Sequence, residues 1–526
     1  MNSNLLLEFC GRALKYTAAT QHFAFIGGTG SGKTVCIRLL LESIWGISTA
    51  HGVPTRMVIY DSKRELLPII HGVFEHLGRT DAAEKITLFN PFDRRGVAWD
   101  ICKDIRKVVH AQEVATLLIP SASGDGKFWT DSAQEIMAAV ITSFIQHRTQ
   151  WDLRDLVLAL GDEATIRAIT ERRADTKRVV ENKLAEQRTA AGVLATLSAA
   201  LHPWRAIAIE WQKATRKVSL REWLKSGEGV LVLGSAETAE TAVQTLNAVL
   251  VKRLSQLVLE TQPEVPRDDP RRIWFVLDEF VRAGKLPGTV ELATKGRSKG
   301  VCLVLGFQDL DGLRAIYGRE VAHEILGQCS NIALLRLNSV ATAEWAAEVI
   351  GKYRAIERRY GVSHSVSSAG FGSHSAAESV DESLIERLSV LPSYFQNIAP
   401  LDESEGIGVI AKTPYWLDKD GFEACELSVT RGQLFDEGDL WSASDRVIGY
   451  DYADTPEWDD SDDWIPEMLD EWTKADYERL EFEAPTGEWK RVYDPNSKTE
   501  PGADGGSTRG RTNAGRADDA LSRGLN

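Results

Sequence analysis

A Gly-rich turn between an apolar strand and an apolar helix constrains the fold of this 526-residue chain more than any other feature. The turn follows the run Phe-Ala-Phe-Ile at 23–26 and has the sequence Gly27-Gly28-Thr29-Gly30-Ser31-Gly32-Lys33-Thr34. Its glycines let backbone N–H groups converge on phosphate oxygens, Lys33 adds a positive charge, and the Thr34 hydroxyl is a suitable ligand for Mg²⁺. An ordinary Gly-rich turn is the alternative, but the flanking strand and helix favour a P-loop that binds ATP and Mg²⁺.

A second apolar strand, Ile273–Leu277, ends in two carboxylates, Asp278 and Glu279. Apolar strands often end in solvated acids, so this pair would carry little weight alone. Together with a P-loop it has a mechanism, because Asp278 can hold the Mg²⁺ shell while Glu279 polarises a water for attack on the terminal phosphate. The pair therefore predicts hydrolysis of the nucleotide in addition to binding.

Composition favours a globular protein in a reducing compartment. Hydrophobic residues make up 43% of the chain, and no uninterrupted apolar run reaches the length of about 18 residues that a membrane-spanning helix needs. The six cysteines include no Cys-x-x-Cys pair, which argues against a zinc site, and no signal-peptide pattern is present. We therefore expect a cytoplasmic protein that does not itself span a membrane.

The net charge of −15 is concentrated at the C-terminus. Residues 436–526 hold 24 acidic and 10 basic side chains, so residues 1–435 are close to neutral. Basic clusters in this neutral part remain free to meet nucleic-acid phosphates, although a solvated helix face is the more ordinary explanation of any one cluster. The three clusters lie within 167–178, 213–221 and 352–359.

Short apolar runs separated by helical patterns predict an α/β fold with a mainly parallel sheet that is covered on both faces. Besides the strand before the P-loop, the expected strands are 57–60, 86–89, 230–233, 273–277, 301–306 and 332–337. We therefore predict a P-loop NTPase domain built around this sheet.

The segment from 104 to 200 lacks strand signals and has apolar residues at helical spacing between Ala133 and Phe144. We therefore predict an all-α subdomain, residues 104–200, inserted between two parts of the ATPase domain, residues 1–103 and 201–435. Residues 363–379, rich in Ser, Gly, Ala and His, predict an exposed loop or loose hairpin.

Residues 436–526 predict an acidic, largely disordered tail. Trp458, Trp464 and Trp472 lie within its most acidic stretch, 451–483. One hypothesis is that these aromatic residues anchor the tail on a basic partner protein. The alternative is a solvated tail that keeps the protein soluble.

An ordered set of motifs over about residues 20–415 resembles the type IV secretion coupling proteins, the conjugative DNA-transfer ATPases related to the septal DNA translocase and to RecA-like hexameric motors. Besides the P-loop, the set comprises Asp61-Ser62-Lys63, Phe89-Asn90-Pro91-Phe92-Asp93, Phe128-Trp129, Trp274–Phe280, Lys295-Gly296-Arg297-Ser298-Lys299-Gly300, Gly306-Phe307-Gln308-Asp309-Leu310 and Tyr317-Gly318. Turn chemistry alone would explain the motifs at Asp61 and Asn90, so we take these two as family markers and assign them no catalytic role.

The resemblance implies a homo-hexameric ring that passes DNA through its centre and binds ATP between subunits. It implies that Arg297 reaches the γ-phosphate in a neighbouring subunit and that Gln308 senses the γ-phosphate. A guanidinium supplied by a neighbour would stabilise the charge on the transferred phosphoryl group and make hydrolysis depend on assembly. The alternatives are a surface arginine at a helix end and, for Gln308, an amide that caps the next helix.

The resemblance also implies the relaxosome with its relaxase and the secretion-channel proteins as partners. Family members usually begin with membrane-spanning helices, and we find none in this sequence. We therefore expect peripheral association, through partners, with the inner face of the bacterial inner membrane.

Three functional hypotheses follow. The first is an ATP-driven DNA translocase for conjugation. The second is a related hexameric motor with a protein or chromosomal DNA cargo, and the third is a recruiting platform that nucleotide merely stabilises. The third explains Glu279 poorly, because a scaffold has no chemical need for a carboxylate that activates water.

Overall fold

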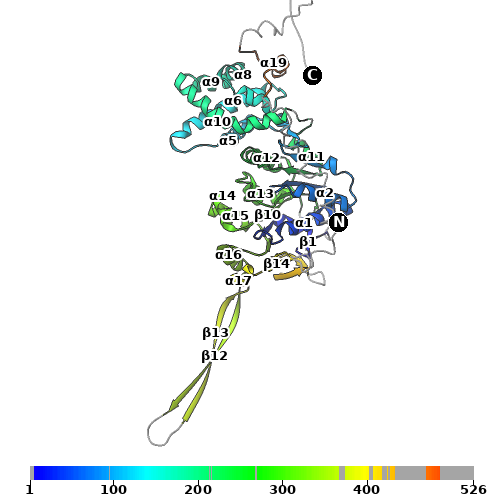
Figure 1. Ribbon diagram of the computed structural model, residues 1–526, viewed down its shortest axis with the longest axis vertical. Helices are drawn as coiled ribbons and strands as arrows, with labels where there is room; N and C mark the ends of the chain where they lie inside the picture. Colours follow the sequence, from blue (N-terminus) through cyan, green and yellow to red (C-terminus); the bar gives the residue numbers. More distant parts are fainter. Residues whose placement is uncertain are drawn as a thin grey trace, which may run out of the picture.

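The computed structural model describes residues 5–93, 95–212, 214, 216–237, 239–266, 269–366, 374–401, 407–417, 423–424, 427–432 and 469–485. The elongated molecule has a central α/β body with a helical unit at one end and a long hairpin at the other (Figure 1). Among the helices of these ranges, none is both long enough and apolar enough to cross a bilayer.

The body is built on a nine-stranded sheet in the order β17-β14-β11-β3-β10-β9-β4-β8-β5. The seven strands from β11 to β5 are parallel, whereas β14 and β17 add an antiparallel edge. The bounds are β3 Phe23–Ile26, β4 Thr55–Tyr60, β5 Ile86–Phe89, β8 Gly229–Leu233, β9 Arg272–Leu277, β10 Val301–Phe307, β11 Asn331–Leu334, β14 Ile407–Lys412 and β17 Leu427–Gly432. The predicted α/β class and its mainly parallel sheet are confirmed, as are all six predicted strands.

Alternation along β3 shows how the sheet is covered on both faces. Phe23 and Phe25 belong to the core shared with α1 (Lys33–His51) and α2 (Leu66–His76). Ala24 and Ile26 belong to the core shared with α12 (Glu240–Thr261) and α13 (Thr289–Lys295). Because successive side chains of a strand point to opposite faces, a strand buried on both faces must be apolar throughout, as β3 is.

The helical unit comprises α5 Val108–Leu118, α6 Lys127–Gln146, α7 Leu153–Ala159, α8 Glu163–Thr170, α9 Ala174–Lys183 and α10 Gln187–Trp211. At its base, β6 (Ala98–Trp99) pairs with β7 (Lys217–Val218). Asp104 joins the two sides, because its carboxylate accepts hydrogen bonds from Trp99 Nε1 at 2.7 Å and from the Ser219 hydroxyl at 2.8 Å. The domain boundary predicted at residue 200 lies inside α10, and the division into domains stays a prediction.

Smaller elements complete the described part of the chain. They are α3 Ala82–Lys85, α4 Ile101–Asp104, α11 Leu220–Ser226, α14 Leu310–Tyr317, α15 Arg319–Gly327, α16 Val340–Ile350, α17 Pro392–Gln396, η1 Tyr16–Gln21, η2 Gly124–Gly126, η3 Gly296–Lys299, β1 Leu6–Phe9, β2 Arg12–Lys15, β15 Trp416–Leu417 and β16 Glu423–Ala424. The last four strands form a separate four-stranded sheet.

The hairpin at the other end consists of β12 (Lys352–Val366) and β13 (His374–Leu388), which form a two-stranded antiparallel sheet. The loose hairpin expected at 363–379 is thus the outer part of a longer one. Residues 367–373 of that prediction lie outside the described ranges. The basic cluster at 352–359 lies on β12 and not on a helix face.

One segment of the predicted disordered tail is ordered. Residues 469–485, which include α19 (Lys474–Leu480), pack on the helical unit and bury Leu480 and Phe482 in its core. Trp472, expected to anchor an external partner, packs against Tyr477 and Phe482, and Arg154 of α7 lies over its ring. Trp472 is therefore half-buried against its own chain, and its role as an anchor for an external partner stays a prediction. Trp458, Trp464 and the rest of 436–526 lie outside the described ranges.

Candidate active site

The P-loop joins β3 to α1 at the carboxyl edge of the parallel sheet. Gly32 has a φ of +91° and caps α1, and a Cβ at this position would approach the Ile407 side chain to 2.7 Å. Backbone bonds hold the loop, since Gly27 N donates to Phe307 O at 3.2 Å and Gly28 N donates to Arg336 O at 2.9 Å. The first-turn N–H groups of a helix have no partner within it, so the N-terminus of α1 presents donors and a positive dipole to an anion.

Asp278 meets the end of the P-loop through Thr34, whose hydroxyl donates to Asp278 Oδ2 at 2.8 Å. The other oxygen, Oδ1, is buried and has no hydrogen-bond partner among the described residues. Burial raises the pKa of Asp278, and the charge of Lys33 opposes this rise. An orphaned carboxylate oxygen beside a hydroxyl fits a Mg²⁺ site, because Mg²⁺ prefers oxygen ligands. The residues present therefore fit a magnesium nucleotide, held by Thr34, Asp278 and the loop.

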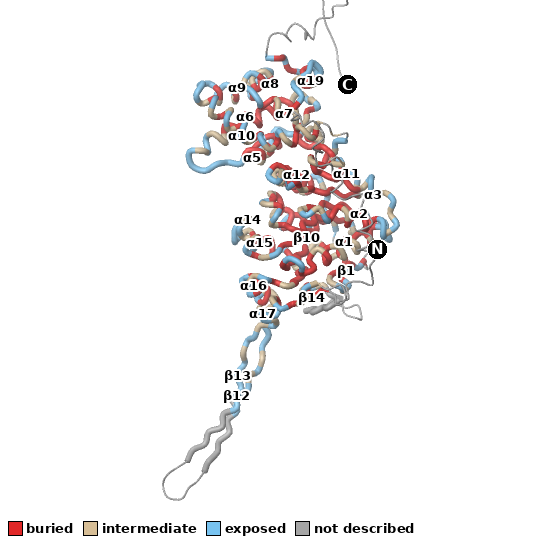
Figure 2. Tube along the Cα trace, in the orientation of Figure 1, coloured by how far each residue is buried: buried red, intermediate tan, exposed pale blue. Residues whose placement is uncertain are grey.

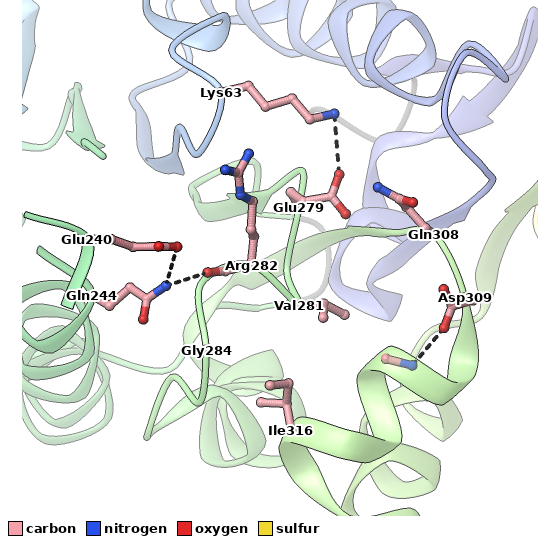
Figure 3. A pocket seen from close by; sticks show the side chains of 11 residues that line it. Lys63, Glu240, Gln244, Glu279, Val281, Arg282, Gly284, Gln308, Asp309 and Ile316 are labelled. Carbon is pink, nitrogen blue, oxygen red and sulfur yellow. Dashed lines mark hydrogen bonds and ion pairs between the residues drawn. The ribbon is translucent and has the colours of Figure 1, made fainter. Parts of the chain in front are cut away.

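Glu279 lies between two lysines. Its Oε2 is 3.1 Å from Lys33 Nζ and 3.4 Å from Lys63 Nζ. Figure 3 shows the contact with Lys63, which reaches Glu279 from the loop that follows the adjacent strand β4. In the sequence, Lys63 is recognisable only as part of a family marker. Its place soon after an apolar strand was the available signal, because parallel strands end at the same edge of a sheet.

Gln308 follows β10, the strand that lies between the P-loop strand β3 and the acidic strand β9. It lines an open pocket of about 660 Å³ together with Lys63, Glu279 and Arg282 (Figure 3). The Thr29 hydroxyl donates to its Oε1 at 3.5 Å. Helix capping, the alternative for Gln308, is wrong, because the cap of α14 is Asp309, which accepts from Gly312 N at 2.7 Å.

Gly306 explains how β10 comes so close to the acidic pair. A Cβ at this position would meet the Asp278 carbonyl oxygen at 2.2 Å. Any larger residue would push the two strands apart at the point where Asp278 and Gln308 emerge.

Arg297 does not join these residues. It lies in η3, before the first residue of β10, whereas Gln308 follows the last. The seven residues of β10 separate them by roughly 20 Å. At this amino edge Arg297 is exposed, contacts the Gln21 amide and lines a pocket of about 530 Å³ together with Lys295. The structure thus brings together Lys33, Thr34, Asp278, Glu279 and Gln308 and leaves Arg297 at the opposite edge.

Asp61 and Asn90 have local structural roles. The Asp61 carboxylate accepts from the backbone N–H groups of Glu65 and Leu67, both at 2.9 Å, at the start of α2. Burial raises its pKa to about 6, although these bonds favour the ionised form. Asn90 Oδ1 accepts from Phe92 N within its own turn. Both contacts are turn or cap chemistry.

A Gly-rich loop, a lysine, a hydroxyl–carboxylate pair suited to Mg²⁺ and a second carboxylate at one edge of this sheet are the features of a RecA-like P-loop NTPase fold. The model of the type IV secretion-system coupling protein DNA-binding domain matches residues 7–413, and the chain therefore belongs to this family.

Individual relatives agree with this assignment. The chain is 26% identical over 345 residues to the coupling protein TraD of Escherichia coli (strain K12), a match that covers 63% of this chain and 44% of TraD. It therefore spans less than half of TraD. Plasmid coupling protein TrwB in complex with ADP and Mg²⁺ matches with a TM-score of 0.57 at 19% identity, over 83% of this chain and 92% of TrwB. Its complex with the ATP analogue ADPNP gives 0.58 over the same shares. At this identity the structural likeness concerns the fold.

Proposed function

We propose that this protein is an ATP-hydrolysing DNA translocase that recruits relaxosome-bound DNA and pumps it into a type IV secretion channel during conjugation. The observation that carries the proposal is the convergence of Lys33, Thr34, Asp278, Glu279 and Gln308 at one sheet edge in a chain of the coupling-protein family. Three of the five are more than nine-tenths buried: Lys33 (6% exposed), Asp278 (4%) and Glu279 (5%). Such a site holds fixed charges out of water, where they act most strongly on a reacting phosphate.

Each side chain has a distinct part in hydrolysis. Thr34 and Asp278 would hold Mg²⁺, which would neutralise charge at the phosphates when bound. Lys33 offsets the negative charge of the terminal phosphate, and the Glu279 carboxylate accepts a proton from the attacking water. Lys63 holds the Glu279 side chain in place, and Gln308 contacts the terminal phosphate from the central strand.

Arg297 supplies the remaining charge from a neighbouring subunit. Its distance from its own P-loop supports this role, because a side chain at the amino edge cannot span β10 to reach a phosphate at the carboxyl edge. In the proposed ring, the face of one subunit that carries the amino edge of the sheet contacts the face of the next subunit that carries the carboxyl edge. Such a head-to-tail contact can close a ring. Hydrolysis then requires assembly, and we propose a homo-hexamer.

The remaining parts of the proposal concern cargo and location. The motor passes DNA through the ring, receives it from the relaxase and its relaxosome, and is held by channel proteins at the inner face of the bacterial inner membrane. Family membership supports this assignment.

The experiment that tests the function is the ATPase rate as a function of protein concentration, without DNA and with single- or double-stranded DNA. We expect the rate per subunit to rise steeply with protein concentration and to rise further with one form of DNA. A rate per subunit that changes with neither protein concentration nor DNA would contradict the proposal. Stimulation by a protein cargo in place of DNA would favour the related protein-transporting motor.

A further inference from the structure

The hairpin β12–β13 extends from the α/β body as an isolated two-stranded sheet (Figure 1). Each strand has 15 residues, which corresponds to a length of roughly 50 Å. Figure 2 shows that the described part of this hairpin is exposed or half-buried along its length. A two-stranded sheet without a further strand or a covering layer is at best marginally stable in water. We therefore expect the hairpin β12–β13 to be stabilised by a partner.

One face of the hairpin carries apolar side chains that nothing in the described chain covers. The register places Ile356 opposite Leu384 and Tyr360 opposite Val380. These four side chains share a face, because their positions on each strand differ by four residues. Their exposed fractions range from 54% to 73%. Burial of such a face would stabilise the hairpin.

The two strands carry opposite charge. β12 holds Lys352, Arg354, Arg358 and Arg359 against a single acid, Glu357. The described part of β13 holds Glu382 and Glu386 against Arg387, and its sequence contains two further acids. Within the hairpin, Arg358 Nε lies 2.8 Å from Glu382 Oε1, and Arg354 Nε lies 3.8 Å from Glu386 Oε1. These charged groups remain more than half exposed, so their outer sides are free to meet another strand.

We propose that β12 of one chain pairs with β13 of a second copy of this chain, so that the hairpins form a continuous antiparallel β-collar around the ring. Each outer edge presents unpaired backbone groups in the described structure, which is the template for strand addition. Pairing of β12 with β12 would oppose basic strands, and pairing of β13 with β13 would oppose acidic ones. Charge therefore permits only the head-to-tail arrangement, which is the arrangement that closes a ring.

The inference rests on the proposed function in one respect, the meeting of copies in a ring. In a hexamer the collar would contain about twelve strands, which is within the size range of closed antiparallel barrels. Closure would leave no free strand edge and would bring the apolar faces of neighbouring hairpins together. The collar would extend the central passage of the motor beyond the body, at the end away from the helical unit.

Disulfide cross-linking between different chains tests the pairing. Ala355→Cys on β12 is mixed with Ser383→Cys, Ile385→Cys or Arg387→Cys on β13, residues that share one face of the hairpin. Under oxidation, at least one mixture is expected to give a covalent dimer that neither single variant gives alone. The chain without added cysteines sets the background. A dimer from Ala355→Cys alone would show β12–β12 pairing and overturn the proposal.

Charge exchange tests the specificity of the contact in the same assay. The fourfold variant R354E/R358E/E382R/E386R keeps both ion pairs within its own hairpin. Combined with the cysteines, it is expected to cross-link to itself as the unchanged chain does, but at least tenfold less to the unchanged chain, because that junction opposes like charges. Equal cross-linking of the variant to itself and to the unchanged chain would overturn the proposal. Ion pairs that act only within one hairpin would give this equal result.

ATPase assays on the same samples separate the two proposals. Concentration-dependent hydrolysis without hairpin cross-links would overturn the collar and leave the proposed motor function standing. A chain that stays monomeric and hydrolyses ATP at a constant rate per subunit would contradict both.

Discussion

Lys33 Nζ lies 3.1 Å from Glu279 Oε2, although 246 positions separate the two residues in the sequence. Both side chains are buried. Lys33 begins α1, after the loop that follows β3, and Glu279 lies in the turn that follows β9; β10 separates these two strands. In the proposed mechanism, the contact joins the group that offsets phosphate charge to the carboxylate that accepts a proton from the attacking water.

Two substitutions at this contact are expected to separate binding from hydrolysis. Lys33→Ala removes the phosphate charge and should abolish nucleotide binding. Glu279→Gln keeps the size of the side chain and should bind nucleotide while losing turnover by about 10² to 10⁴. Fluorescent-nucleotide titration and single-turnover hydrolysis measure the two effects. Hydrolysis by Glu279→Gln at the unchanged rate would remove the catalytic assignment.

Lys63 is expected to position Glu279 and to contribute little to nucleotide affinity. Lys63→Ala should lower kcat by about 10- to 100-fold and change KM for ATP by less than about threefold, because only one contact to the carboxylate is lost. Lys63→Arg keeps a cation in reach and should recover part of the rate. An equal loss in both substitutions, or a large rise in KM with kcat unchanged, would assign Lys63 to binding.

The sequence predicted which motif residues meet at the carboxyl edge of the sheet better than it predicted their neighbours. P-loop and Asp-Glu signals are local, because each needs only one strand and the residues after it, and they identified Lys33, Thr34, Asp278 and Glu279. The position of Lys63 depends on the order of strands in the sheet, which periodicity does not reveal. Strand order likewise decides that Gln308 lies between the two halves of the site while Asp309 caps the helix.

The tail shows what composition leaves open. Its composition is acidic and rich in Gly and Ser, and it predicts a largely disordered segment over 436–526. It does not predict that a short stretch finds complementary charges on the helical unit. The main contact is made by Asp155 of α7, which is fully buried and accepts two hydrogen bonds from Arg479 of the tail, at 2.7 and 2.8 Å.

Arg479 is therefore expected to fix the ordered tail segment to the helical unit. Arg479→Ala leaves the buried Asp155 with only the more distant guanidinium of Arg154, at 3.6 Å, and should lower the free energy of unfolding of the helical unit by about 3 kcal/mol. Lys474→Ala, which removes an exposed pair with Glu478, is the matched control and should cost less than about 0.5 kcal/mol. Urea unfolding followed by tryptophan fluorescence measures both. Indistinguishable midpoints would mean that the docked segment does not stabilise the unit.

His22 is expected to make the body sensitive to acid. Its ring accepts from Leu303 N at 3.1 Å and contacts Ala293 O at 3.0 Å, and burial, with a smaller effect of the Arg297 charge, lowers its pKa from 6.5 to about 4. Between pH 6.5 and 4, His22 is therefore protonated in the unfolded chain and neutral in the folded chain. Stability from this group is complete above pH 6.5 and falls by up to about 3 kcal/mol as the pH reaches 4.

A comparison with His22→Gln isolates this contribution from that of other titrating groups. The amide offers one acceptor and one donor but does not titrate. Unfolding midpoints at pH 7 and pH 4.5 should show a larger loss on acidification for the unchanged chain than for the variant. Parallel losses would exclude His22 as the cause.

The central claim is that hydrolysis needs Arg297 from one subunit and the P-loop of another, and a mixing experiment tests it most directly. Arg297→Ala and Lys33→Ala proteins are each expected to be nearly inactive, with a loss of about 10³ or more for the arginine variant, whereas Lys299→Ala, in the same turn, serves as the control. When the two inactive variants are mixed, some interfaces pair an intact Lys33 with an intact Arg297, so a substantial part of the ATPase activity should return. Near-normal activity of Arg297→Ala alone, or no recovery in mixtures shown to co-assemble, would contradict the account.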